Sequence, residues 1–222
     1  MKKATGNMYS FVTHTWNPVR GKCFYNCVYC YTERWGKLPP LHLDEKAIKE
    51  KLGENNFIFI CSGCDLFHPS VPDEWISRVI LHTKKYPENK YLLHTKNPER
   101  ALLWEQNITD NHILCVTIET DYSFKPSMSL APSPDKRLLS LAKWTHKKMV
   151  TVEPIMSFSN YFPQKLLESK PDQVNIGANS GKQKLPEPDA NDIELFVKCL
   201  EQFTKVVLKK NLKRIYPGGN YG

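Results

Sequence analysis

The alternation of apolar runs with capped polar segments constrains the fold of this chain more than any other feature of its sequence. Seven short runs have the composition of β-strands, and they cover residues 11–15, 56–61, 90–95, 112–119, 149–153, 173–178 and 205–208. Between them, a Ser or Asn close ahead of a Pro and an acidic residue marks helix starts at 70–74, 97–99 and 133–135. Strands that alternate with helices in this way indicate βαβ units and a parallel sheet.

The length of the chain limits how many such units it holds. The chain has 222 residues, whereas a full eight-unit barrel usually takes about 250. We therefore expect a single α/β domain over residues 1–222, a TIM-like partial (β/α)6 barrel with parallel strands. Residues 205–222 form either its last strand or a basic C-terminal extension.

Composition favours a globular protein with an anionic partner. Hydrophobic residues make up 41% of the chain and charged residues 24%, and no run of about 18 apolar residues occurs. We therefore expect no membrane association, and a charged N-terminus without an apolar segment after it predicts a cytoplasmic protein. The formal net charge of +8 favours a nucleotide or nucleic acid as partner, although many basic enzymes bind neither.

Polar residues follow the expected strands at the positions where parallel α/β folds bind their ligands. After the first strand come three cysteines, and after the others come Gly63-Cys64-Asp65, His94-Thr95-Lys96, Glu119, Glu153 and Asn179-Ser180-Gly181. The carboxyl ends of parallel strands meet at one face of the sheet. Six polar strand ends are hard to explain as core packing, so we expect a functional site at this face.

The three cysteines, Cys23, Cys27 and Cys30, fall within eight residues of one loop. Thiolates are the ligands of iron–sulfur clusters, and three of them leave the fourth iron of a 4Fe–4S cluster open to a small chelating molecule. The total of seven cysteines is odd, which argues against a disulfide framework in a chain without a signal peptide.

Other interpretations of this loop stay open. A zinc site needs a fourth ligand, which a distant His14 or His68 would supply, and the chain would then be a zinc-stabilised nucleic-acid-binding module. A cluster without catalysis would make it an iron–sulfur electron carrier or sensor. A redox pair of Cys27 and Cys30 is also conceivable, but the surrounding pattern is not that of a thioredoxin.

A Cys-x3-Cys-x2-Cys loop after the first strand of a partial barrel resembles the hallmark of the radical S-adenosylmethionine (SAM) superfamily. Residues 15–21, 65–69, 71–73, 95–100 and 152–154 are similar to motifs of largely uncharacterised phage and bacterial members. Spore photoproduct lyase, a DNA repair enzyme, is a more distant relative.

The resemblance implies a cofactor-borne chemistry. In the superfamily the open iron of the cluster holds SAM, and one electron cleaves it to methionine and a 5′-deoxyadenosyl radical, which takes a hydrogen atom from the substrate. An oxygen-sensitive enzyme of this kind needs an electron donor such as flavodoxin or ferredoxin. Because the chain is short, we also expect a partner protein or a second copy to close the site.

The resemblance also suggests residues for the SAM pocket. Tyr29 matches the aromatic position that lies against the adenine. Ser62 and Gly63, with Asp65 beyond them, occupy the turn that binds the SAM amino group. Glu119 would accept hydrogen bonds from the ribose hydroxyls or form a structural salt bridge.

Four further residues complete the set of candidates. Lys96 would meet the SAM carboxylate or a substrate phosphate, and Glu153 would fix a loop or Lys96. Asn179 would lie near the adenine or the methionine carboxylate. Cys64 is a candidate catalytic residue, a hydrogen-atom or thiyl relay, although with Cys61 it would equally form a pair of small buried hydrophobic residues.

Overall fold

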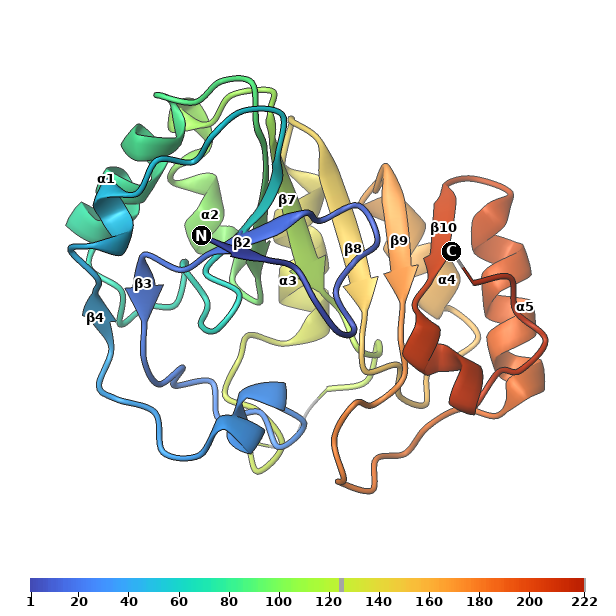
Figure 1. The fold of residues 1–222 in the computed structure, drawn as a ribbon. Coiled ribbons are helices and arrows are strands. Elements are labelled where there is room, and N and C mark those ends of the chain that lie inside the picture. Colours follow the sequence, from blue (N-terminus) through green and yellow to red (C-terminus); the bar gives the residue numbers. More distant parts are fainter. Residues whose placement is uncertain (124–125, 222) are drawn as a thin grey trace.

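The computed structural model describes residues 1–123 and 126–221, and its main element is an open β-sheet (Figure 1). Within these residues the sheet has eight strands in the order β1-β2-β5-β6-β7-β8-β9-β10. Only β1 pairs antiparallel with its neighbour, and every other pairing is parallel. The predicted α/β architecture with parallel strands is therefore confirmed.

The strands of the large sheet are β1 (Lys2–Lys3), β2 (His14–Trp16), β5 (Phe57–Ile60), β6 (Lys90–Thr95), β7 (His112–Thr117), β8 (Lys148–Val152), β9 (Gln173–Ile176) and β10 (Lys205–Leu208). A small antiparallel sheet pairs β3 (Val19–Arg20) with β4 (His42–Leu43). The α-helices are α1 (Asp73–Thr83), α2 (Pro98–Leu102), α3 (Pro134–Ala142), α4 (Phe162–Glu168) and α5 (Ala190–Glu201). Short 3₁₀ helices are η1 (Tyr31–Trp35), η2 (Ala47–Lys49), η3 (Glu105–Asn107) and η4 (Lys210–Arg214).

The helices begin close to where the sequence predicts them. Asn97 caps α2 by accepting a hydrogen bond from the backbone of Arg100, and Ser133 caps α3 in the same way. Helix α1 begins at Asp73 without a side-chain cap, and Pro72 is its N-cap residue. A single crossover, residues 17–56 between β2 and β5, contains no α-helix among the described residues, and it carries the cysteine loop.

Two apolar layers lie on opposite faces of the sheet. The larger one packs the sheet against the helices and includes Ile60, Leu93, Val116 and Phe196. The smaller one fills the concave face, where Tyr9, Val12, Phe59, Leu92, Ile113 and Cys115 cluster. Figure 1 shows the N-terminal segment crossing in front of the sheet while α3 and α4 lie behind it. The N-terminal segment thus supplies part of the interior of the partial barrel.

The cysteine loop lies at the end of the sheet to which the strands point. In Figure 1 the arrowheads of β7, β8 and β9 face the blue loop that contains η1. No helix within the described ranges is long and apolar enough to cross a membrane.

Candidate functional site

The cysteine loop is held in a tight, defined conformation. Gly21 has a φ of +114°, and a Cβ there would lie 2.4 Å from the carbonyl oxygen of Pro40, so only glycine fits. Asn26 has a φ of 47°, which Asn adopts more readily than most residues. The backbone N–H of Cys30 donates to the carbonyl of Cys27 at 2.9 Å. These turns bring all three cysteines into one small cluster with Tyr25, Tyr29 and Met156.

A second segment, residues 128–130, clamps this loop from the side. The Val28 N–H donates to the carbonyl of Met128 at 3.0 Å, and the Leu130 N–H donates to the carbonyl of Tyr25 at 2.7 Å. The Cys27 Sγ lies 3.1 Å from the hydroxyl of Ser129. The thiol positions are therefore fixed by contacts with the connection between β7 and α3.

The chemistry of the donor set fits a 4Fe–4S cluster with one open iron, because three thiolates supply three of its four protein ligands. Cys23, Cys27 and Cys30 are free, and Cys27 is buried. No group of three or more His, Cys, Asp or Glu side chains in residues 1–123 and 126–221 is arranged to hold one metal ion. In a 4Fe–4S cluster each thiolate binds a different iron, so the sulfurs stand further apart than around one ion. Burial raises the pKa of Cys23 to about 12, and an iron would favour its thiolate form.

The two histidines considered as zinc ligands have other partners. His68 packs edge-on against Tyr25 with ring centroids 4.3 Å apart, and its Nδ1 accepts a hydrogen bond from the Ser70 backbone. His14 lies on β2, and its Nδ1 is 3.0 Å from the hydroxyl of Thr13. Among the residues that the structure describes, neither histidine belongs to a group of side chains arranged around one metal ion.

A buried carboxylate, Glu119, lies beside the cysteine loop. The Tyr29 hydroxyl donates to its Oε1 at 2.7 Å, and the Lys96 ammonium forms an ion pair with the same oxygen. Arg137, which is itself completely buried on α3, donates to Oε2 at 2.8 Å. The Lys96 Nζ also lies 5.2 Å from the centre of the Tyr29 ring. Residues from the cysteine loop, from the segments directly after β6 and β7, and from α3 thus form one charged cluster.

The charges in this cluster keep Glu119 ionised. Burial pushes its pKa upward, but Arg137 and Lys96 outweigh burial and lower the pKa to about 2. Two cations around one carboxylate leave a positive charge, and Lys96 is the member that reaches solvent, with 17% of its side chain exposed.

The turn after β5 is attached to the cysteine-bearing crossover. Asn17 accepts hydrogen bonds through Oδ1 from the Ser62 hydroxyl at 3.1 Å and from the Gly63 N–H at 3.4 Å. The hydroxyl of Tyr31 donates to the Ser62 carbonyl. A Cβ on Gly63 would lie 3.2 Å from the Trp35 ring, so this turn packs directly on η1.

Asp65 joins the end of β5 to the end of β6. Its carboxylate accepts hydrogen bonds from the Thr95 hydroxyl at 2.8 Å, the Lys96 N–H at 2.7 Å and the Phe67 N–H at 2.9 Å. Burial raises the pKa of Asp65 despite these bonds. Asp65 therefore fixes the position of the Lys96 backbone, from which the Lys96 side chain extends.

Cys64 lies against the core, next to Cys61. Its thiol donates to the Val19 carbonyl at 3.2 Å, and Cys61 is buried. A hydrogen bond with Cys61 and burial raise the pKa of Cys64. Cys64 therefore has the contacts of a small, partly buried side chain that packs between β3 and the end of β5.

Glu153 belongs to a second polar cluster at the same end of the sheet. It pairs with Lys209, and its Oε1 accepts hydrogen bonds from Asn211 at 2.9 Å and Asn7 at 2.8 Å. A Cβ on Gly177 would lie 2.8 Å from the Glu153 carboxyl carbon, so glycine leaves room for this carboxylate.

The side chain of Asn179 makes its hydrogen bonds within its own loop. Its side chain donates to the Gln183 carbonyl at 2.7 Å and accepts from the Gly181 N–H at 2.9 Å. The structure thus brings Tyr29, Lys96 and Glu119 into contact, whereas Glu153 and Asn179 lie in separate sets of contacts.

The sequence interpretation assigned no site role to Arg137 or to Asn17, although Asn17 lies within the motif at 15–21. Arg137 shares the buried face of α3 with Leu138 and Leu141, and a charged residue at a position with apolar spacing is a signal that a partner is buried nearby. Asn17 follows β2 directly, so its position after a strand was the available signal.

Comparisons with known proteins agree with this fold. A family model described as a protein of unknown function (DUF5131) matches residues 7–210. No curated protein sequence matches the chain significantly. Among solved structures, a spore photoproduct lyase variant with bound AdoMet and dinucleoside spore photoproduct superposes with a TM-score of 0.60 at 13% identity, over 92% of this chain and 74% of that protein.

Structures of a second protein, SuiB, superpose on this chain about as well. SuiB of Streptococcus suis bound to S-adenosylmethionine gives a TM-score of 0.61 at 11% identity, over 97% of this chain and 55% of SuiB. The chain therefore spans about half the length of SuiB and has the fold of these radical SAM enzymes.

Proposed function

The chain belongs to the DUF5131 family, and we propose that it is a radical SAM enzyme whose cluster is held by Cys23, Cys27 and Cys30. One observation carries the proposal. The loop with the three free cysteines lies at the carboxyl ends of a parallel sheet, and its Tyr29 is hydrogen-bonded to the buried Glu119, which lies just after β7. Cofactor sites of such folds form at this face.

When bound, the cluster and SAM would supply a one-electron cleavage that yields methionine and a 5′-deoxyadenosyl radical. The residues of the chain would prepare the pocket. The three thiolates would hold three irons and leave one open, and the hydroxyls of Ser129 and Thr32, at 3.1 Å and 3.0 Å from the sulfurs of Cys27 and Cys30, would donate hydrogen bonds to these thiolates.

The Glu119 cluster would position two groups that face the pocket. Both oxygens of Glu119 are already in ion pairs, so we assign it the role of holding Tyr29 and Lys96 rather than of binding the ribose. Tyr29 would offer its ring to the adenine, and Lys96 would offer its ammonium to a carboxylate or phosphate. The Ser62–Gly63 turn, fixed by Asn17, would receive the SAM amino group.

For the substrate we propose a nucleotide or a component of nucleic acid. The net charge of +8 supports this class, and among the proteins of similar fold a spore photoproduct lyase binds a dinucleoside spore photoproduct. Binding of a single-stranded oligonucleotide should then weaken steeply with salt. If no oligonucleotide or nucleotide binds in a salt-dependent way, the substrate proposal is wrong while the cofactor proposal stands.

The proposed enzyme would work in a reducing cytoplasm, where its cysteines stay free. An electron donor such as flavodoxin or ferredoxin would reduce the cluster. A partner protein or a second copy of the chain would close the site.

The deciding experiment measures SAM cleavage in the reconstituted protein. We would purify it without oxygen, add iron and sulfide, then dithionite and SAM, and measure 5′-deoxyadenosine. Cys27→Ala should lose both the iron and the product. Cys199→Ala, which removes a thiol on α5, is the matched control and should keep both.

Two outcomes would contradict the proposal. A brown protein that binds iron through Cys27 but never cleaves SAM, even with oligonucleotides or nucleotides added, would be an electron carrier or sensor. A colourless protein that holds about one zinc would be the zinc-stabilised nucleic-acid-binding module.

A further inference from the structure

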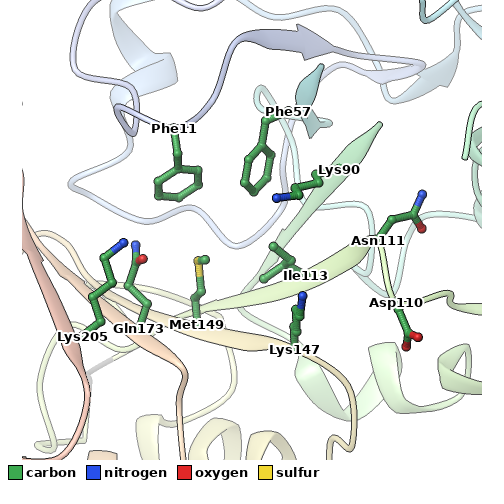
Figure 2. Close-up of a pocket in the computed structure, with 10 residues that line it drawn as sticks. All are labelled: Phe11, Phe57, Lys90, Asp110, Asn111, Ile113, Lys147, Met149, Gln173 and Lys205. Carbon is green, nitrogen blue, oxygen red and sulfur yellow. The ribbon is translucent and has the colours of Figure 1, made fainter. Parts of the chain in front are cut away.

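A cavity lies at the opposite end of the sheet from the cysteines. It has a volume of about 470 Å³, which is within the usual range of small-molecule sites. Its lining residues lie on or next to the amino ends of the strands: Phe11, Phe57, Lys90, Asp110, Asn111, Ile113, Lys147, Met149, Gln173 and Lys205. Figure 2 shows these side chains around one open space.

The charge around this cavity is mainly positive. Lys90, Lys147 and Lys205 come from three different parts of the sheet and are exposed. Across the described part of the chain, none of their ammonium groups forms an ion pair or a side-chain hydrogen bond, whereas Lys96 and Lys209 each pair with a glutamate. Three unpaired ammonium groups around one cavity favour an anionic ligand.

The only acidic lining residue, Asp110, does not neutralise these lysines. Its side chain is 98% exposed, and its Oδ1 lies 3.3 Å from the Nδ1 of His146. The carboxylate thus lies at the edge, and the cavity keeps an excess of positive charge.

The rest of the lining is apolar and aromatic. The rings of Phe11 and Phe57 lie 4.9 Å apart at 42°, and Figure 2 places them across the space from Lys205 and Lys147. In the same view Met149 lies opposite the Phe11 ring, level with Lys205, and Ile113 lies between Phe57 and Lys147. Aromatic rings and a methionine offer a surface to a flat ring system, and the lysines offer charge to a phosphate.

We propose that this cavity, which we name the amino-end cavity, binds a nucleoside phosphate. The base would pack on Phe11, Phe57 and Met149, and the phosphates would lie among Lys90, Lys147 and Lys205. This site is independent of the proposed function, because it lies at the other end of the strands from the cysteine loop. A nucleotide bound there would not occupy the SAM pocket.

Calorimetric titration of the purified protein with ATP, and separately with inorganic tripolyphosphate, tests this site. A double variant, Lys147→Ala with Lys205→Ala, should weaken ATP binding about a hundredfold, because it removes two charge-assisted contacts that each contribute about a tenfold factor in affinity. Lys213→Ala removes an exposed lysine of η4 near the other end of the sheet and should leave ATP binding unchanged. Phe11→Leu should weaken ATP binding and leave tripolyphosphate binding unaffected. Thermal melts identify any variant that is not folded.

Three results would overturn the proposal. The first is no ATP binding at millimolar concentration. The second is an equal effect of the lysine double variant and of Lys213→Ala on ATP affinity. ATP would then bind at another site, such as the SAM pocket. The third is tripolyphosphate binding as tight as that of ATP and insensitive to Phe11→Leu, which would make the cavity a simple anion site without a place for the base.

Discussion

Glu119 shows how one buried charge organises the site. Removing a carboxylate from water is costly, so it stays ionised only with partners close by. Arg137 and Lys96 supply that compensation, and Tyr29 adds a hydrogen bond. The orientation of the Tyr29 ring on the cysteine loop therefore depends on the charge of a residue in the core.

Glu119→Gln should destabilise the fold strongly. It keeps the shape of the side chain but leaves Arg137 buried opposite a neutral group, and breaking a buried pair costs about 3–5 kcal/mol. Urea denaturation measures the difference. Asp135→Asn is the control, because that residue pairs with Lys165 at 3.4 Å on the surface and should cost less than about 1 kcal/mol. Equal effects of both variants would contradict the assigned role.

The same variant also predicts a pH dependence. The pKa of Glu119 in the folded state is about 2, below the usual 4.5. The ionised carboxylate therefore stabilises the fold fully above about pH 4.5, and this stabilisation is lost as the pH falls towards 2. The stability difference between the wild type and Glu119→Gln should therefore shrink over that window. A difference that stays constant from pH 5 to pH 3 would show that charge is not the cause.

At the scale of elements, the strand ends are joined to one another by side chains rather than by further secondary structure. Asp65 links the turn after β5 to the end of β6, and Asn17 links the same turn to the crossover after β2. Asn97 continues the series, because it caps α2 and donates to the Phe67 carbonyl at 3.0 Å. The loops of the site are thus held in place relative to the rigid sheet.

Asp65→Ala should loosen this arrangement. It leaves the Thr95 hydroxyl and two backbone N–H groups without an acceptor in a buried place, so we expect a loss of about 3 kcal/mol in the free energy of unfolding. Asp189→Ala is a suitable comparison, because it removes the N-cap of α5 at the surface and should cost about 1 kcal/mol. Chemical denaturation of both variants measures this, and a smaller loss for Asp65→Ala than for Asp189→Ala would refute the argument.

The accuracy of the sequence-based prediction differs between elements for physical reasons. The runs at 90–95 and 205–208 form strands with those bounds, because apolar runs that lie between helical segments are typical of strands in a parallel sheet. The first strand was expected at 11–15 but covers His14–Trp16. Val12 instead joins the interior cluster with Tyr9, and a short apolar run does not distinguish a strand from a segment that fills a barrel.

The candidate site was only partly predictable. The spacing of the cysteines is local, so the sequence displays it directly. The contact between Lys96 and Glu119 joins residues that follow two neighbouring strands, β6 and β7, and strand order is compatible with it. The contacts of Glu119 with Arg137 and of Gly63 with Asn17 depend on tertiary packing, which no local pattern encodes.

At the scale of the whole molecule, residues 7–9 near the N-terminus and residues 209–211 near the C-terminus meet beside the end of β8. Asn7 and Asn211 both donate to Glu153, and the Lys209 ammonium lies 4.6 Å from the centre of the Tyr9 ring. An open sheet exposes its concave face, and here the N-terminal segment covers it. The fold should therefore depend on a segment that precedes the first parallel strand.

Tyr9 is the residue that tests this dependence. Its ring is buried among Phe59 and other interior residues, and its hydroxyl lies 2.6 Å from that of Thr151. Tyr9→Ala should cost about 3–5 kcal/mol, because it opens a cavity in the interior. Tyr9→Phe, which removes only the hydrogen bond, should cost about 1 kcal/mol. Tyr161→Ala, at a side chain that is 70% exposed, should change stability by less than about 0.5 kcal/mol.

Thermal and urea unfolding, with binding of a hydrophobic dye as a second signal, separate the possible results for Tyr9. Dye binding by the folded Tyr9→Ala protein would mean that the concave face has become accessible, as expected if the N-terminal segment covers the interior. A variant as stable as Tyr161→Ala, without dye binding, would mean that the sheet and its helices are stable without this cover. The parallel strands and their helices would then be enough to hold the domain together, and the contacts of the N-terminal segment, such as that of Asn7 with Glu153, would add little to its stability.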